Sequence, residues 1–180
     1  LRFTLFRPFN WIGPGLDSIY TSKEGSSRVV TQFLGHIARG EPINLVDGGL
    51  QKRTFTYIND GIEALSLILA NKNDVANGKI YNIGNPVNNF SVKELANMML
   101  TIAKRIPEYR ETALQVVIQE TTSNAYYGNG YQDVQNRVPK IQNTIDELHW
   151  HPKTTMADAL EHIFEAYRHD VIKARNLVEN

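Results

Sequence analysis

A stretch between residues 126 and 139 gathers aromatic, amide and charged side chains around two glycines. It reads YYGNGYQDVQNRVP and has almost no apolar periodicity, so it is poor core material. Glycines let the backbone bend where side chains would clash, and Tyr, Gln, Asn and Arg supply stacking faces and fork-shaped donors. These groups suit a polar ligand with phosphates or sugar hydroxyls. The alternative is a solvated connection ending in a helix whose first turn begins at Pro139.

The run from Asp47 to Arg53 is a second candidate for binding. Lys52 and Arg53 could hold a diphosphate, because arginine supplies a planar fork and lysine a point charge beside open backbone. Short strands are expected on either side, over residues 43–45 and 55–57, with a Gly-Gly turn between them. The alternative is a solvated hairpin turn, because charged turns are common.

Several kinds of catalytic and metal site lack their sequence pattern. No G-x-G-x-x-G turn, Tyr-x-x-x-Lys pair or Gly-x-Ser-x-Gly nucleophile elbow occurs. The histidines near the C-terminus share no tight helical face with a clear third ligand, so no metal site is expected. The sequence therefore predicts that this chain alone binds no dinucleotide cofactor.

The elements that must position these residues alternate between strands and helices. A capping box is predicted at Ser91 and Glu94, another at Asp60 and Glu63, and a helix start at Ser26 or Ser27. Strands are expected over residues 2–7, 79–83 and 114–118, and the final helices over 141–148 and 156–167, separated by Pro152. This alternation favours an α/β architecture with residues 1–180 as a single domain or part of one.

Composition excludes several classes of partner. Lys and Arg number 19, Asp and Glu also 19, and the pI is near 7.2, so neither nucleic acid nor an anionic membrane is expected to bind. The longest nearly apolar run, residues 64–70, is far too short to span a bilayer. The chain has no cysteine, which fits a reducing compartment and leads us to expect a cytoplasmic protein.

Four motifs together resemble the C-terminal half of the extended short-chain dehydrogenases. They are RPFNWIGP from Arg7, NLVDGGLQKR from Asn44, YNIGNP from Tyr81 and the stretch at 126–139. Within that superfamily, SNAYYGNGYQDV from Ser123 resembles the decarboxylase domain of the bifunctional polymyxin-resistance proteins. That family oxidises and decarboxylates UDP-glucuronic acid with NAD in the modification of lipid A with aminoarabinose.

The resemblance implies an α/β, Rossmann-like fold of which this chain is the substrate-binding side. The family's NAD loop, Ser/Thr-Glu pair and Tyr-x-x-x-Lys pair would all lie N-terminal to Leu1. The chain also opens in a strand-like segment without an initiator methionine, so we expect a fragment, inactive by itself, of a homo-oligomeric enzyme.

The resemblance also implies roles for individual residues. Asn10 would contact the nucleotide sugar, Tyr131 would bind the UDP part, and Arg137 would be the proton donor in decarboxylation. The ten residues expected to embrace UDP are Asn44, Leu45, Val46, Asp47, Gly48, Gly49, Leu50, Gln51, Lys52 and Arg53. Leu50 departs from the pattern, because a family member carries lysine there.

Arg137 suits the chemistry of a β-keto acid. Loss of CO₂ leaves an enolate, and a nearby cation stabilises that charge and can organise proton delivery. Arginine is a weak acid, so stabilisation is the safer half of this assignment. Other interpretations remain: an epimerase, a dehydratase or a UDP-xylose-forming decarboxylase acting on nucleotide sugars, or a non-catalytic binding module.

Overall fold

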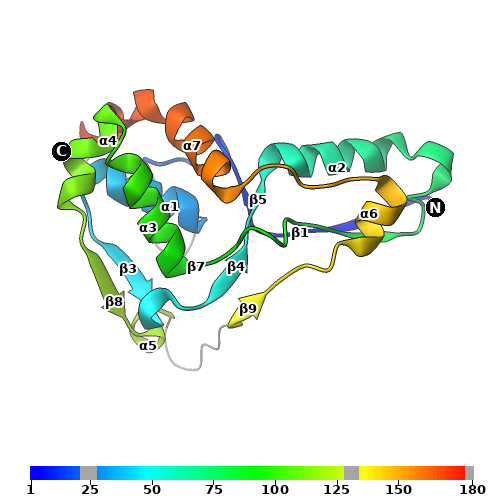
Figure 1. The fold of residues 1–180 in the computed structure, drawn as a ribbon, viewed down its shortest axis with the longest axis horizontal. Helices are drawn as coiled ribbons and strands as arrows, with labels where there is room; N and C mark the ends of the chain where they lie inside the picture. The colour runs from blue at the N-terminus through cyan, green and yellow to red at the C-terminus, as the bar shows by residue number, and fades with distance from the viewer. Residues whose placement is uncertain (21–27, 128–133, 177–180) are drawn as a thin grey trace.

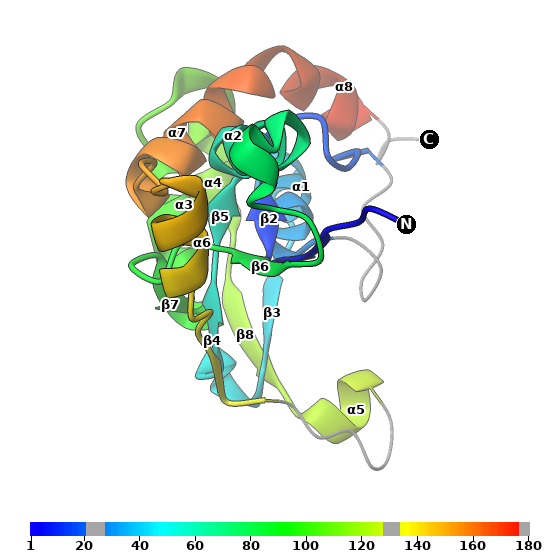
Figure 2. The ribbon, with the colours of Figure 1, turned by 90° about the vertical axis from the view of Figure 1, so that its right-hand side faces the viewer.

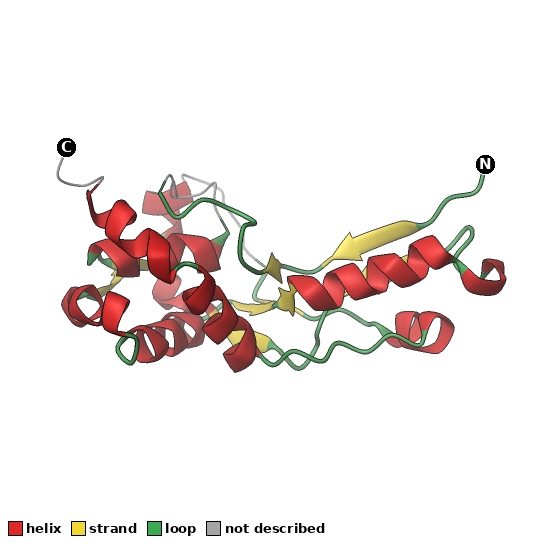
Figure 3. Ribbon diagram, turned by 90° about the horizontal axis from the view of Figure 1, so that it is seen from above, coloured by secondary structure: helices red, strands yellow, loops and turns green. Residues whose placement is uncertain are grey.

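The computed structural model describes residues 1–20, 28–127 and 134–176 of the chain. Figure 1 shows an elongated molecule, and Figure 3 shows from above that most helices gather at one end. The helices are α1 (Val29–Arg39), α2 (Ile58–Ala70), α3 (Val92–Ala103), α4 (Pro107–Gln115), α5 (Ser123–Tyr127), α6 (Gln142–Leu148), α7 (Met156–Ala166) and α8 (Val171–Asn176).

The strands form small sheets, most of them parallel pairs. They are β1 (Leu5–Pro8), β2 (Trp11–Ile12), β3 (Ile43–Val46), β4 (Lys52–Thr54), β5 (Thr56–Tyr57), β6 (Ile80–Ile83), β7 (Asn89–Ser91), β8 (Ile118–Thr121) and β9 (Asn136–Arg137). Strands β1 and β6, β2 and β5, and β3 and β8 pair in parallel, whereas β4 lies between antiparallel β7 and parallel β9. Figure 2 shows β3 and β8 running side by side toward α5. Helices connecting parallel strands confirm the predicted α/β class.

Two hydrophobic clusters hold these elements. The larger packs α1, α3, α4, α7 and α8 together and includes Leu34, Tyr109 and Phe164. The smaller lies between α2, α6 and β6 and centres on Tyr81 and Trp150. The indole of Trp150 donates to the carbonyl of Asp60 at 2.9 Å, which satisfies its polar atom inside the core.

Several predicted helices are confirmed. Ser91 caps α3, with its hydroxyl accepting from the Glu94 amide at 3.1 Å while its own amide donates to the Glu94 carboxylate at 2.7 Å. Gly40 ends α1 with φ 72°, a left-handed conformation that favours glycine. The helices expected over 141–148 and 156–167 also form, as α6 and α7, and Pro152 separates them.

The predicted capping box at Asp60 and Glu63 is wrong. Helix α2 begins earlier, at Ile58, and no side chain caps it. Asp60 is buried, and its carboxylate accepts from the amide and hydroxyl of Thr154 at 3.0 and 3.2 Å. A contact with a distant segment has therefore replaced the expected local one.

The strand expected over residues 114–118 is also wrong except at its last residue, Ile118. Proline is favoured in the first helical turn, and Pro107 starts α4, which continues to Gln115 before β8 begins at Ile118. The alternative helix start at Pro139 fails as well, because α6 begins at Gln142. Strand β1 is shorter than expected and begins at Leu5.

Candidate substrate-binding site

Strand β4 carries the two basic residues that the sequence predicted in a turn. The strands on either side of the Gly-Gly turn form no hairpin, because β3 pairs with β8 and β4 pairs with β7 and β9. Lys52 and Arg53 therefore lie within the middle strand of a sheet. The solvated-hairpin interpretation is wrong, because pairing with distant strands decides this local geometry.

Arg53 and Arg137 are direct neighbours across β4 and β9. Their Cα atoms are register partners, so both side chains project from the same face of the sheet. The Arg53 guanidinium donates to the carbonyls of Lys52 and Val134 at 2.8 and 2.7 Å, while Arg137 is exposed. Two guanidinium groups on one face could both donate to a bound anion.

Asn10 reaches the same sheet from the end of β1. Its φ of 36° is left-handed, and its amide Nδ2 donates to the carbonyl of Thr54 at 2.9 Å. Thr54 in turn donates its hydroxyl to the carbonyl of Arg137, also at 2.9 Å. The structure thus links Asn10, Thr54 and Arg137 at the end of β4 beside Arg53, whereas Lys52 projects from the opposite face of the sheet. Sequence reasoning missed Thr54, because a threonine in a short strand gives no signal of this role.

The turn after β3 has a backbone that requires small residues. Asp47, Gly48 and Gly49 have φ values of 48°, 72° and 66°. A Cβ added at Gly49 would lie 3.1 Å from the Lys93 backbone nitrogen and 3.2 Å from a Leu45 methyl, so the turn fits closely against α3. The Asp47 carboxylate accepts from the Ser123 amide at 2.8 Å and ties the turn to α5.

The ten residues predicted to hold UDP lie in different environments. Leu45 and Val46 are buried in the core on β3, so only their backbone could face a ligand, and Asn44 beside them is half-buried. Leu50 is 68% exposed, and the carbonyl of Gln51 accepts from the Val92 amide at 3.2 Å. The run therefore divides into a core strand, a tight turn and the basic strand β4.

The loop at 126–139 is described only in part. Its first residues end α5, and residues 136–137 form β9. Tyr131, predicted to bind UDP, lies outside the described residues, as do its neighbours from 128 to 133.

The Glu94 carboxylate lies near Lys52. The amide and hydroxyl of Ser91 hold the pKa of Glu94 below its usual value, and the charge of Lys52 lowers it further. Ser91 is the register partner of Lys52 on β7. The capping box of α3 therefore lies beside the first residue of β4.

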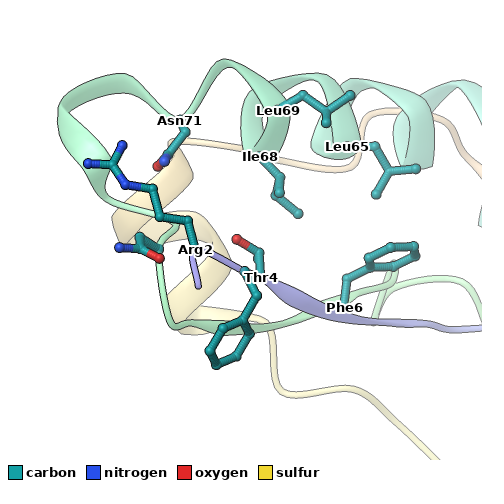
Figure 4. Close-up of a pocket in the computed structure, with 9 residues that line it drawn as sticks. Arg2, Thr4, Phe6, Leu65, Ile68, Leu69 and Asn71 are labelled. Carbon is teal, nitrogen blue, oxygen red and sulfur yellow. The ribbon is translucent and has the colours of Figure 1, made fainter.

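An apolar pocket of about 430 Å³ lies elsewhere, between the N-terminal segment and α2. Figure 4 shows Phe6 and Thr4 facing Leu65 and Ile68 across it. None of the predicted site residues lines this pocket. It is therefore distinct from the candidate site around β4.

Metal ions, membranes and dinucleotides each require a structural feature of their own. Within residues 1–20, 28–127 and 134–176, no group of His, Cys, Asp and Glu could hold a metal ion. In the same part of the chain, each helix is too short or too polar to cross a membrane. NAD needs a glycine-rich turn from a strand into a helix, but Gly13 follows β2 into a loop and Gly48 lies in a 3-10 turn. These two described turns therefore lack the arrangement of the dinucleotide loop.

Known proteins show the same architecture. Residues 1–84 match the NAD dependent epimerase/dehydratase family. The crystal structure of the PbgP3 protein from Burkholderia pseudomallei is 64% identical, with a TM-score of 0.82, over 98% of this chain and 49% of that one.

More distant structures share the fold at lower identity. UDP-glucose 4-epimerase from Thermotoga maritima, solved with UDP-glucose, is 22% identical with a TM-score of 0.72, over 95% of this chain and 47% of that one. UDP-glucuronic acid 4-epimerase from Bacillus cereus, solved with UDP-glucuronic acid and NAD, is 19% identical with a TM-score of 0.71, over 92% and 45%. The chain spans about half the length of these structures. It thus has the fold of the extended short-chain epimerases and dehydratases, and its first 84 residues match the NAD dependent epimerase/dehydratase family.

Proposed function

We propose that this chain is the substrate-binding side of an NAD-dependent UDP-glucuronate decarboxylase. The pairing of Arg53 with Arg137 on one face of the β4 sheet carries the proposal. UDP-glucuronic acid has two kinds of anionic group, a diphosphate and a carboxylate, and two adjacent guanidinium groups suit such a ligand. The likeness of the loop at 126–139 to the decarboxylase family supports this choice of ligand.

The site residues would contact different parts of the substrate. The turn and strand from Asp47 to Arg53 would hold the UDP part together with Tyr131, and Asn10 would contact the nucleotide sugar. Arg53 is expected to contribute more than Lys52, because its planar fork lies on the same face of the sheet as Arg137. Family resemblance alone supports the wider setting, a cytoplasmic homo-oligomer acting in lipid A modification and polymyxin resistance.

Arg137 would act when the sugar carries a ketone at C4. The bond from C5 to the carboxylate then breaks, CO₂ leaves, and the electron pair forms an enolate with negative charge on the C4 oxygen. The Arg137 cation would stabilise that charge and orient the proton that is finally added at C5. The oxidation that supplies the ketone is assigned to no residue described here.

An epimerase or dehydratase acting on nucleotide sugars is the second candidate. It is favoured by the match of residues 1–84 to the NAD dependent epimerase/dehydratase family. Such an enzyme keeps every carbon of its sugar and needs no cation to meet a carboxylate-derived enolate. The fate of the carboxylate therefore separates the two functions.

The test uses the full-length protein that carries this sequence. With NAD and UDP-glucuronic acid, we expect CO₂ release and a UDP-pentose, measured by mass spectrometry. UDP-glucose, which lacks the carboxylate, is the matched control and should lose no carbon. A product that keeps the carboxylate and is inverted at C4 would instead identify an epimerase.

The 180-residue chain by itself allows a second measurement. We expect calorimetry with NAD to show no saturable binding at micromolar concentrations, because the sequence lacks a glycine-rich dinucleotide turn. Saturable binding would reveal a cofactor site that the sequence pattern does not predict.

A further inference from the structure

Thr54 is fully buried at the end of β4 and contacts two predicted site residues through different atoms. Its hydroxyl donates to the carbonyl of Arg137, and its own carbonyl accepts from the amide of Asn10. These partners lie 83 and 44 residues away in the sequence. A single side chain and its backbone therefore join three distant segments.

The pattern of the β4–β9 ladder explains why Asn10 reaches this carbonyl. The Lys52 amide donates to the Gln135 carbonyl at 2.8 Å. If the parallel ladder continued beyond the Arg53–Arg137 pair, the carbonyl of Thr54 would accept from the amide of residue 139. Residue 139 is proline and has no N–H. The Asn10 side chain supplies the donor that the ladder lacks.

Pro139 lies at the end of this ladder, where the Asn10 side chain replaces the missing backbone donor. It is buried against Gly84, where an added Cβ would lie 2.6 Å from Pro139 Cγ and 3.0 Å from Phe9 Cβ. Pro139 and Phe9, the residue that precedes Asn10, thus both pack against Gly84. The absence of a side chain at Gly84 lets the end of the ladder and the segment that carries Asn10 approach the same point.

We propose that Thr54 is a positioning residue that sets Arg137 relative to Asn10. This inference rests on the proposed function, because that function gives Arg137 the role for which it must be positioned. The Thr54 hydroxyl adds a side-chain bond to the carbonyl of Arg137, the last residue of the β4–β9 ladder. Without that hydroxyl, β9 would still pair at Lys52 and Arg53, but the Arg137 guanidinium would be less precisely positioned.

The test compares two substitutions at Thr54 in the full-length enzyme. Thr54→Val keeps the branched shape and removes the donor to Arg137, whereas Thr54→Ser keeps the donor and loses a methyl group. We expect Thr54→Val to lower kcat roughly tenfold and to change KM for UDP-glucuronic acid by less than about threefold, because small misplacements of a reacting group mainly affect chemistry. Thr54→Ser should keep most of kcat.

Thr144→Val is the matched control. Thr144 is also fully buried, and its hydroxyl on α6 donates to the carbonyl of Asn82 on β6 at 2.9 Å; neither residue is a predicted site residue. It should lower the melting temperature about as much as Thr54→Val and leave kcat unchanged. An equal loss of kcat in both variants would overturn the proposal, because loss of stability would then explain the effect.

Hydrogen exchange supplies a readout that does not depend on the reaction. Thr54→Val should speed amide exchange over residues 136–138, and Thr144→Val should not. If the wild-type enzyme fails to decarboxylate UDP-glucuronic acid but this exchange effect appears, the proposed function fails while the link through Thr54 stands. Unchanged exchange at 136–138 would overturn the inference whatever the activity.

Discussion

Strand β4 and strand β1 differ in how far neighbouring strands and side chains cover them. Strand β4 has a neighbour on each side, and side chains of Asn10 and Thr54 bond the polar groups near its end. Strand β1 pairs only with β6 among the described strands, and all of its residues are exposed. Side chains thus satisfy the polar groups at the end of β4, whereas the parallel pair leaves apolar surface uncovered.

Apolar side chains are exposed on both faces of the β1–β6 pair. Phe6 is 43% exposed and faces α2, whose Leu69 is 84% exposed, whereas Leu5 and its register partner Ile80 are 54% and 43% exposed on the opposite face. Parallel sheets are normally covered on both faces, and exposed apolar surface of this kind marks contact sites. The comparison separates the proposed polar binding region from an apolar surface suited to packing against protein.

The largest expected effect lies in the polar region, at Arg137. In the full-length enzyme, Arg137→Ala should lower kcat about 100-fold and raise KM much less, because the lost interaction strengthens in the transition state. Arg137→Lys should restore only part of the rate, since a point charge cannot reproduce a planar fork.

Arg110→Ala is the matched control for Arg137, because Arg110 is exposed on α4, away from the site. It should leave kcat unchanged. A kcat within about threefold of wild type for Arg137→Ala, far from the ~100-fold loss of a charge-stabilising donor, would leave Arg137 with a structural role only.

Lys52 and Arg53 of β4 give a second test of the polar region. Replacing either with alanine should weaken UDP-glucuronic acid binding by roughly 1 to 3 kcal/mol for each charge-assisted bond lost. Arg53→Ala should have the greater effect, because it also removes the hydrogen bond to the Val134 carbonyl. Calorimetry with UDP measures this in the full-length enzyme, and unchanged affinity in both variants would contradict a diphosphate contact.

On the apolar side, the 180-residue chain is expected to self-associate through β1 and α2. Leu69→Lys should weaken that association roughly tenfold or more, since burying one leucine contributes about 1.5 to 3 kcal/mol. Leu114→Lys is the control, because Leu114 is 66% exposed on α4. Light scattering measures the effect, and a stable monomer of the unaltered chain would show that this face needs no partner.

The smallest expected effect concerns the cap next to β4. Ser91→Ala should lower the free energy of unfolding by about 1 kcal/mol, because it removes the hydroxyl from the capping box. The pKa of Glu94 is lowered by the fold, so its stabilising contribution is present above its unfolded pKa and is lost as pH falls through the folded value. Denaturant melts at neutral and acidic pH check this. A Ser91→Ala defect of the same size at both would contradict it.

Local signals in the sequence were sufficient for several elements. Ser91 and Glu94 satisfy each other within one turn, and Gly40 ends its helix because glycine adopts a left-handed backbone without strain. These features depend only on neighbours in the chain. The α/β class followed in the same way from the alternation of strands and helices.

Asp60 shows where local reasoning fails. Its spacing to Glu63 suits a capping box, yet its carboxylate bonds Thr154, 94 residues away. The hairpin expected around the Gly-Gly turn failed for the same reason, because β4 found partners in β7 and β9. In both cases a long-range bond in a buried setting outweighed the local one.

The sequence by itself determined which side chains could bind an anionic nucleotide sugar, because residue type alone fixes charge and donor geometry. Lys52, Arg53 and Arg137 were recognisable before any fold was known. Only the tertiary structure decided that Arg53 and Arg137 are register partners and that Thr54 joins Arg137 to Asn10. Strand pairing between distant segments depends on which surfaces can be buried together, and no local pattern records that choice.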